Sequence, residues 1–198
     1  MGIAWKRTVG PTVEPVSLDE AKAHLRVDIN ADDLLLERLI TAAREYVEDA
    51  TGRALINQTW QLSLDAWPVE GYIELPRAPL SSVTSIVYTD SGNTNNTFAA
   101  SNYVADTDSE PGRIVLKYGC EWPTVTLANG QPIKITYVSG YGTTSDSVPQ
   151  HLRQAILLLV GHWYENREAS VVGQGYSQSA LPFALQSVIV LNRVNFWR

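Results

Sequence analysis

The sequence predicts an α+β fold: a helical bundle built on a long buried helix, with an inserted small antiparallel β-region and an extended or helical C-terminal arm. Three patterns carry this prediction. Residues 149–168 contain a run of six apolar side chains in a helical stretch. Residues 36–50 place apolar side chains three and four positions apart, as one face of a helix requires. Residues 59–65 and 132–137 alternate polar and apolar side chains, which is typical of half-buried strands.

The stretch 149–168 is expected to be the central helix. Pro149 suits a first helical turn, where its missing N–H has no partner to lose, and apolar residues fill positions 155–160. A helix that is apolar on nearly every side must be surrounded by protein. At about 20 residues it would extend roughly 30 Å, but its apolar run is too short to cross a membrane. The other elements should therefore pack on it.

Two further helices are expected before it. Ser17 and Glu20 have the spacing of a capping box, which predicts a short helix from residue 17 to about residue 26. Asn30 precedes two acids at the start of a longer helix, where the helix dipole favours carboxylates. Gly52 is expected to end that helix in a left-handed conformation.

Residues 55–142 are expected to form the inserted β-region. Short strand candidates lie between the two alternating segments, separated by turns rich in Pro, Gly, Asn and Asp. They cover residues 72–75, 82–88, 103–105 and 113–116. Residues 90–96 are polar and predict the tip of a hairpin. This spacing favours an antiparallel sheet or small barrel.

The predicted organisation has four parts. Residues 1–16 contain two prolines, and no hydrophobic period can be followed through them. This indicates an extended N-terminal arm. Residues 17–54 and 148–168 form the helical body around the β-region at 55–142. Residues 169–198 are expected to be a flexible linker, polar and glycine-containing up to residue 180, followed by an apolar C-terminal docking arm.

Composition and charge exclude several classes of protein. The 198 residues are 44% hydrophobic, enough for a substantial core, and carry a net charge of −6, which gives no cationic surface for gripping nucleic acid. Cys120 is the single cysteine and cannot form an intramolecular disulfide. With no export signal visible at the N-terminus, a reducing bacterial cytoplasm is expected.

No residue pattern predicts catalysis, a metal or a cofactor. His24, His151 and His162 lie on separate predicted helices without a paired Cys or His. Residues 28–39 begin with the spacing of a calcium loop but lack its glycine and its final glutamate. No serine lies in a Gly-x-Ser-x-Gly motif. A non-enzymatic protein is therefore expected; an enzyme whose site is assembled from dispersed residues is the less favoured alternative.

The order of several motifs resembles the head-tail connector proteins of long-tailed phages. The first part of the chain contributes VSLDEAKAHLRV at 16–27, DDL at 32–34, AAREYVE at 42–48 and TGR at 51–53. Later motifs resemble the branch of this family with an inserted β-region: IELPRAPL at 73–80, PGRI at 111–114, YVSGYG at 137–142 and the helical stretch 148–168. The resemblance extends more weakly to residue 198. Adaptors of gene transfer agents are similar in length and layout.

The resemblance implies a structural virion protein, an adaptor at the head-tail junction or virion neck, assembled in the bacterial cytoplasm. Such an adaptor forms a homododecameric ring between the portal protein and the next neck protein, a stopper or tail-completion protein. DNA passes through the lumen without sequence-specific binding, and no membrane is involved. From the residues alone, a cytoplasmic α+β binding module with no virion role remains the alternative.

The C-terminal arm is the predicted docking site for the portal or a neighbouring subunit. A polar linker followed by apolar residues is what folding on binding requires. The residues expected to make the contact are Leu181, Phe183, Leu185, Val188, Leu191, Arg193, Phe196 and Trp197. The alternative is that this arm folds back on the helices of its own chain.

Overall fold

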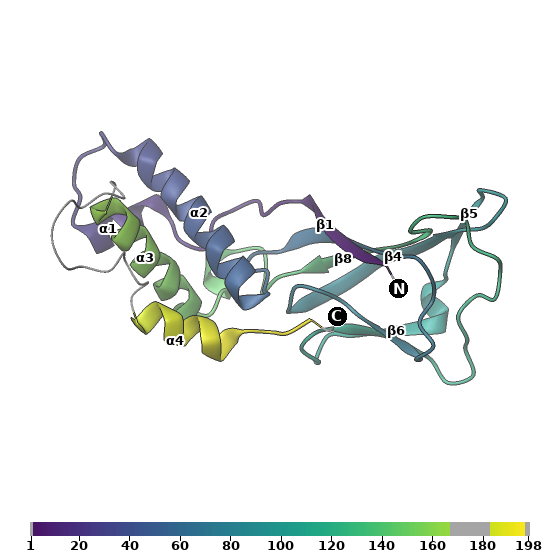
Figure 1. Cartoon of the computed structure of the whole chain (residues 1–198). Helices are drawn as coiled ribbons and strands as arrows, with labels where there is room; N and C mark the ends of the chain where they lie inside the picture. Colours follow the sequence, from purple (N-terminus) through teal and green to yellow (C-terminus); the bar gives the residue numbers. More distant parts are fainter. Residues whose placement is uncertain (1, 167–182, 197–198) are drawn as a thin grey trace, which may run out of the picture. The chain divides into compact units, whose positions relative to one another are not determined.

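The computed structural model describes residues 2–166 and 183–196, and the side chains of residues 183 and 184 are outside that description. The chain divides into two compact units. The β unit comprises Met1–Thr12, Gly52–Thr143 and Val194–Arg198. The helical unit comprises Val13–Thr51 and Thr144–Arg193. Each unit is therefore assembled from segments far apart in the sequence (Figure 1).

The larger sheet of the β unit has five antiparallel strands in the order β1-β2-β8-β4-β5. Their bounds are β1 (Ile3–Val9), β2 (Gln58–Leu64), β8 (Ile133–Ser139), β4 (Leu80–Thr89) and β5 (Asn95–Thr97). Side chains alternate between buried and half-buried along the whole of β2, as the alternating sequence predicts. One face of this sheet therefore carries the core.

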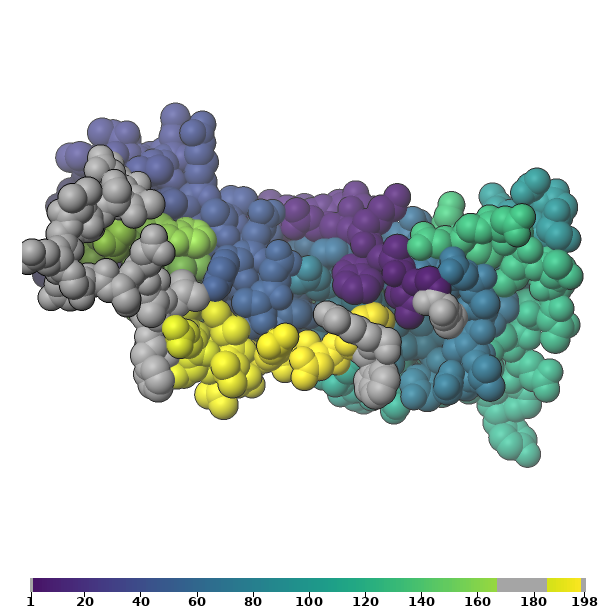
Figure 2. All heavy atoms as spheres, viewed as in Figure 1, coloured from purple at the N-terminus to yellow at the C-terminus, as the bar shows by residue number. Residues whose placement is uncertain are grey.

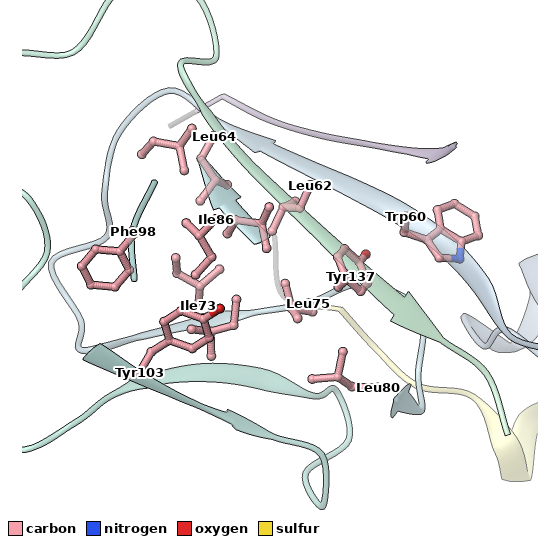
Figure 3. Close-up of a cluster of buried hydrophobic side chains, with 13 residues drawn as sticks. Trp60, Leu62, Leu64, Ile73, Leu75, Leu80, Ile86, Phe98, Tyr103 and Tyr137 are labelled. Atoms are coloured by element: carbon pink, nitrogen blue, oxygen red, sulfur yellow. The ribbon is translucent and has the colours of Figure 1, made fainter. Parts of the chain in front are cut away.

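The smaller sheet has three antiparallel strands in the order β3-β7-β6. They are β3 (Tyr72–Glu74), β7 (Arg113–Leu116) and β6 (Tyr103–Asp106), with the short 3-10 turn η1 (Ala100–Asn102) before β6. Ile73, Ile114 and Tyr103 point from these strands into the same core as Leu62 and Ile86 of the larger sheet. Figure 3 shows Ile73 and Tyr103 close to Leu62 and Ile86 between the two sheets. The core of the β unit is thus a sheet-on-sheet interior.

The hairpin tip predicted at residues 90–96 is confirmed as the turn between β4 and β5. Asp90 accepts hydrogen bonds from the backbone N–H groups of Gly92 and Thr94 and from the side-chain amide of Asn96. These hydrogen bonds lower the pKa of Asp90, and the bond from the Thr94 N–H has the largest effect. The turn is held by one carboxylate, which is how short polar residues close a hairpin.

The helical unit contains α1 (Leu18–Leu25), α2 (Asp33–Thr51), α3 (Gln150–Glu165) and α4 (Phe183–Asn192), with the 3-10 turn η2 (Ser145–Ser147) before α3. The predicted capping box of α1 is confirmed: the Glu20 N–H donates to the Ser17 hydroxyl, and the Ser17 N–H donates to the Glu20 carboxylate. Gly52 follows α2 with a φ of +71°, the predicted left-handed conformation. Helix α3 buries Leu152, Ile156 and Leu159, so the expected buried helix is present.

A buried arginine holds the helical unit together beside its apolar residues. Arg44 of α2 is 3% exposed. Its guanidinium donates to Glu14 at 2.8 Å and to Glu48 at 2.9 Å. Glu14 lies in the segment before α1 and also accepts from the Thr41 hydroxyl. The pairing with two carboxylates compensates the removal of the Arg44 charge from water.

The expected helical bundle with a small β insertion is wrong. The described residues form four helices and two antiparallel sheets of five and three strands, with helix and strand roughly balanced. The sheets have their own core, and α1 to α4 pack with one another in the helical unit. The error has a physical cause, because strands distant in sequence join into one wide sheet that local patterns cannot reveal. No helix in the described ranges is both long and apolar enough to cross a membrane.

Candidate functional site

Exposed apolar side chains that lie next to one another mark candidate surfaces for binding other proteins. In the helical unit, Val190 and Leu191 at the end of α4 are 72% and 83% exposed. In the β unit, Ile3 and Trp5 of β1 are 38% and 45% exposed. Figure 2 shows α4 in yellow and β1 in purple at the surfaces of their units. These two surfaces are the candidate functional sites.

Helix α4 packs against α2 and α3 on one side and is open on the other. Leu185 is fully buried, whereas Val188 is half-buried. Near the end of the helix, the Asn192 amide donates to the Val188 carbonyl at 2.8 Å. The Asn192 side-chain oxygen lies 2.8 Å from the His151 ring of α3. The exposed end of α4 is thus fixed in place by polar contacts.

The predicted docking residues are only partly brought together. Leu185, Val188, Leu191 and Arg193 lie in the helical unit, and Phe196 lies in the β unit. Leu185 faces the interior, whereas Leu191 and Arg193 are exposed. Leu181, Trp197 and the side chain of Phe183 lie outside the described residues, as does the predicted linker at 169–180. The docking role of these residues stays a prediction.

The last described residues run along the β unit. The Val194 carbonyl lies so close to Gly52 that a Cβ there would approach it to 2.6 Å. Gly52 therefore meets two requirements, a positive φ and a close backbone approach. Phe196 then makes an edge-to-face contact with Trp5 of β1, with ring centroids 5.4 Å apart. This contact continues the chain's C-terminal segment onto the exposed strand.

Strand β1 is the candidate surface that the sequence analysis did not identify. Residues 1–16 were expected to be an extended N-terminal arm, whereas Ile3–Val9 forms a strand that pairs with β2 in antiparallel register. A signal was present, since Ile3, Trp5 and Val9 alternate with small or polar residues. The missing information was the pairing partner, which lies from 50 (Val9 to Thr59) to 61 (Ile3 to Leu64) residues later in the chain.

A charged cluster in the β unit has a structural geometry. Arg53 donates to the two carboxylate oxygens of Glu110 at 2.8 and 2.6 Å and to the Tyr141 hydroxyl at 2.9 Å. The hydrogen bond from Arg53 lowers the pKa of Glu110, and burial raises the pKa of Tyr141. Both shifts move these groups away from titration near neutral pH. The hydrogen bonds of Arg53 therefore hold the loop at Glu110 in place. Neither Glu110 nor Tyr141 is suited to act as a general acid or base near neutral pH.

A surface depression lies between α1 and α3 of the helical unit. It has a volume of about 400 Å³ and is lined by His24, Leu25, Arg26, Leu158, Gly161, His162 and Glu165. No serine, threonine or cysteine is among these lining residues. Within the part of the chain that the structure describes, no group of three or more His, Cys, Asp or Glu side chains could hold a metal ion. The depression lacks the parts of a nucleophilic or metal centre.

The sequence matches the head completion protein family over residues 15–184. This range runs from the segment before α1 to the start of α4 and includes both sheets apart from β1. No curated protein sequence is significantly similar to the chain. The match agrees with the resemblance to head-tail connector proteins seen in the sequence, which is confirmed.

Solved structures of gene transfer agent (GTA) particles contain similar chains. A chain in the virion of a native GTA particle is 25% identical, with 98% of this chain and 97% of that chain covered and a TM-score of 0.78. A chain in the neck of an empty GTA particle, computed with C6 symmetry, is 26% identical and has a TM-score of 0.77. The match covers 100% of this chain and 98% of that chain. A chain in the neck of a native GTA particle, computed with C12 symmetry, is 26% identical, with the same coverage and a TM-score of 0.75. The likeness thus includes both units.

Proposed function

The chain belongs to the head completion protein family, and from this premise we propose that it is the head-tail adaptor of a phage or gene transfer agent particle. In this role it forms a ring in the neck, between the portal protein and the next neck protein. DNA passes through the lumen of the ring. A head completion protein is a structural component of a virion, so the expectation of a non-enzymatic protein is confirmed at the level of the family.

One observation carries the proposal. A chain of the same fold, in the neck of a native GTA particle computed with C12 symmetry, matches this chain over its full length. A cyclic ring joins copies through two different surfaces of each subunit. This chain offers exposed apolar surface on both of its units, on α4 and on β1. Exposed apolar surfaces of this kind are suited to contacts with other proteins.

The portal contact is assigned to the C-terminal region. Val190 and Leu191 are held at the exposed end of α4, beside the exposed cation Arg193. Apolar side chains fixed on a helix make a contact at a smaller entropic cost than side chains on a free loop. Within the predicted docking residues, Leu191 and Arg193 are thus the described members best placed to touch a partner, and Leu185 supports the helix from inside.

The passage of DNA is supported by charge. The chain carries 21 acidic and 15 basic side chains. Each phosphate contact made by a Lys or Arg strengthens binding through counterion release, and many such contacts would hold a moving duplex back. A net negative subunit makes few of them. The two alternatives suggested by the residues, a cytoplasmic binding module and an enzyme with a dispersed site, gain no support from the family.

The test is removal of this chain from a particle-producing cell. We expect capsids that contain the portal but lack tails, because the next neck protein has no ring to bind. Supplying the wild-type chain from a plasmid should restore tailed particles, and this restoration is the control. Tailed particles in normal numbers without the chain would overturn the proposal.

A further inference from the structure

The last turn of α4 carries the apolar pair assigned to the portal contact. Val190 and Leu191 are 72% and 83% exposed, so their own burial does little to fix the backbone that carries them. Leu185, which is fully buried, lies more than one turn earlier in the helix. Helix ends fray because their last carbonyl groups lack intrahelical partners. A polar contact at the end of α4 therefore has a direct effect on where the pair lies.

A hydrogen-bonded bridge spans this turn. The side-chain N–H of Asn192 donates to the Val188 carbonyl at 2.8 Å. The side-chain oxygen of Asn192 lies 2.8 Å from Nε2 of His151, at the start of α3. Because Val188 and Asn192 are four residues apart, Val190 and Leu191 lie between them in the same turn. The bridge joins this turn to α3, on which α4 packs (Figure 1).

The bond to Val188 determines the direction of the second hydrogen bond. A side-chain amide donates through its nitrogen and only accepts through its oxygen. Because the Asn192 nitrogen donates to the Val188 carbonyl, its oxygen faces the His151 ring. Nε2 of His151 must therefore carry a proton and donate it. The neutral ring protonated at Nε2 and the imidazolium both have this proton, so the bridge does not need a charged ring.

His151 belongs to a well-anchored turn. It is the second residue of α3, and the next residue, Leu152, is fully buried. Arg153 in the same turn donates to the Pro15 carbonyl at 3.0 Å and to the Glu20 carboxylate of the α1 capping box. The start of α3 is thus fastened to α1 and to the segment before α1. The exposed ring of His151 extends from this anchored turn to α4.

We propose that His151 is a positioning residue for the portal contact. Its Nε2–H holds Asn192 and, through Asn192, the last turn of α4, so that Val190 and Leu191 are presented on a fixed surface. The inference rests on the proposed function, in which this surface meets the portal. His151 acts through Asn192 and need not touch the portal itself. Fixing the apolar pair before binding removes part of the ordering cost that binding would otherwise have to meet.

Two variants of nearly equal size separate a donor from an acceptor at position 151. His151→Gln keeps an N–H at about the reach of Nε2, whereas His151→Glu supplies only acceptor oxygens at neutral pH. A carboxylate in the first turn of α3 is favoured by the helix dipole, so α3 itself should not be weakened. Hydrogen–deuterium exchange of the amides at 189–192 should stay near the wild-type rate in His151→Gln. It should be two- to fivefold faster in His151→Glu, where fivefold corresponds to the net contribution of about 1 kcal/mol of one hydrogen bond.

The matched control is Gln154→Glu. Gln154 is exposed nearly one turn later on α3, and its change also converts an amide into a carboxylate, at a position outside the bridge. Exchange at 189–192 should keep the wild-type rate in this variant. In an Asn192→Ala background, the difference between the two His151 variants should disappear, because the acceptor is gone. Equal exchange of His151→Gln and His151→Glu in the otherwise wild-type chain overturns the inference.

Binding to purified portal rings connects the bridge to the proposed function. We expect wild-type affinity for His151→Gln and Gln154→Glu and at least twofold weaker binding for His151→Glu, since only chains with an ordered last turn are competent to bind. Thermal melts of all three variants should stay near the wild type. Equal affinity of the two His151 variants overturns the positioning role, even where their exchange differs. A wild-type chain that does not bind the portal would instead refute the proposed portal contact, on which the positioning role depends.

Discussion

The helical unit and the β unit have interiors of different composition. In the helical unit the interior is closed and includes a charge, Arg44, held by Glu14 and Glu48. In the β unit the interior is apolar, and its central row runs outward to Trp5 at a free edge. The helical unit buries a compensated charge among its apolar residues, whereas the β unit relies on apolar contacts that end at a partly exposed edge strand.

The largest stability effect is expected in the helical unit. Arg44→Ala removes the guanidinium from Glu48, whose side chain is only 6% exposed. Breaking a buried pair by removing one partner costs about 3–5 kcal/mol, because a carboxylate then stays buried without its cation. Chemical denaturation should show this loss in the free energy of unfolding. Arg38→Ala, on the exposed face of α2, is the control and should change it by no more than about 0.5 kcal/mol. Equal effects would contradict a closed, charge-dependent interior.

The next largest loss of stability is expected at the centre of the larger sheet, and a smaller loss is expected at its edge. Leu62 is fully buried on β2, and Leu62→Ala should lower the free energy of unfolding by about 2–5 kcal/mol through lost contacts and a cavity. Ile3→Ala, on the same face of the sheet but 38% exposed, should cost less than half as much. Thermal or urea unfolding of the two variants measures the ratio. A larger loss for Ile3→Ala would mean that the edge is already covered in the monomer.

A smaller, pH-dependent effect belongs to the Arg53 cluster of the β unit. The Glu110 side chain is 42% exposed, so solvent screening limits the loss from Glu110→Gln to roughly 0.5–1 kcal/mol at pH 7. The hydrogen bond from Arg53 lowers the pKa of Glu110 below its ordinary 4.5. The stabilisation is therefore present above that pH and is lost as the pH falls through the lowered pKa.

Urea unfolding of wild type and Glu110→Gln between pH 7 and pH 3 checks this sign. The two curves should converge at the acid end. Glu121→Gln, at an exposed position of the same unit, should follow the wild type throughout. A difference that grows as the pH falls would contradict the assigned pair.

The smallest effect on stability should accompany a large effect on assembly. Val190→Asp with Leu191→Asp alters two side chains that are mostly exposed on α4, so the free energy of unfolding should change by less than about 0.5 kcal/mol. Attachment to the portal should nevertheless be lost, because a carboxylate in an apolar contact must be desolvated without a partner. Leu34→Asp, 70% exposed at the start of α2, is the control and should assemble normally. Pull-down with purified portal rings measures the attachment of the double variant and of the control.

The helices could be predicted because their information is local. The capping box at Ser17, the stop at Gly52 and the apolar run of α3 all lie within a few residues of the structure that they determine. The individual short strands were also visible. Their assembly was not, since the paired residues of β1 and β2 are 50 to 61 positions apart and Arg53 and Glu110 are 57 apart. Local periodicity contains no information about such partners.

The candidate site could be predicted only in part for a related reason. Helix α4 is apolar on nearly every side, so no stripe distinguishes the face that packs from the face that stays exposed. Leu185 and Leu191 therefore looked equivalent in sequence, although one is buried and the other is 83% exposed. The same limit applies to α3, where the half-buried Leu158 is indistinguishable by pattern from the fully buried Leu159.

A cryo-electron-microscopy reconstruction of the neck, from particles assembled with this chain, tests the ring most directly. We predict copies of the chain in a cyclic ring at the head-tail junction, with the twelve-fold symmetry used for the related native GTA neck. A channel for DNA should run through the centre of the ring. A neck that lacks the chain, or that contains it without cyclic contacts between copies, would contradict the proposed function.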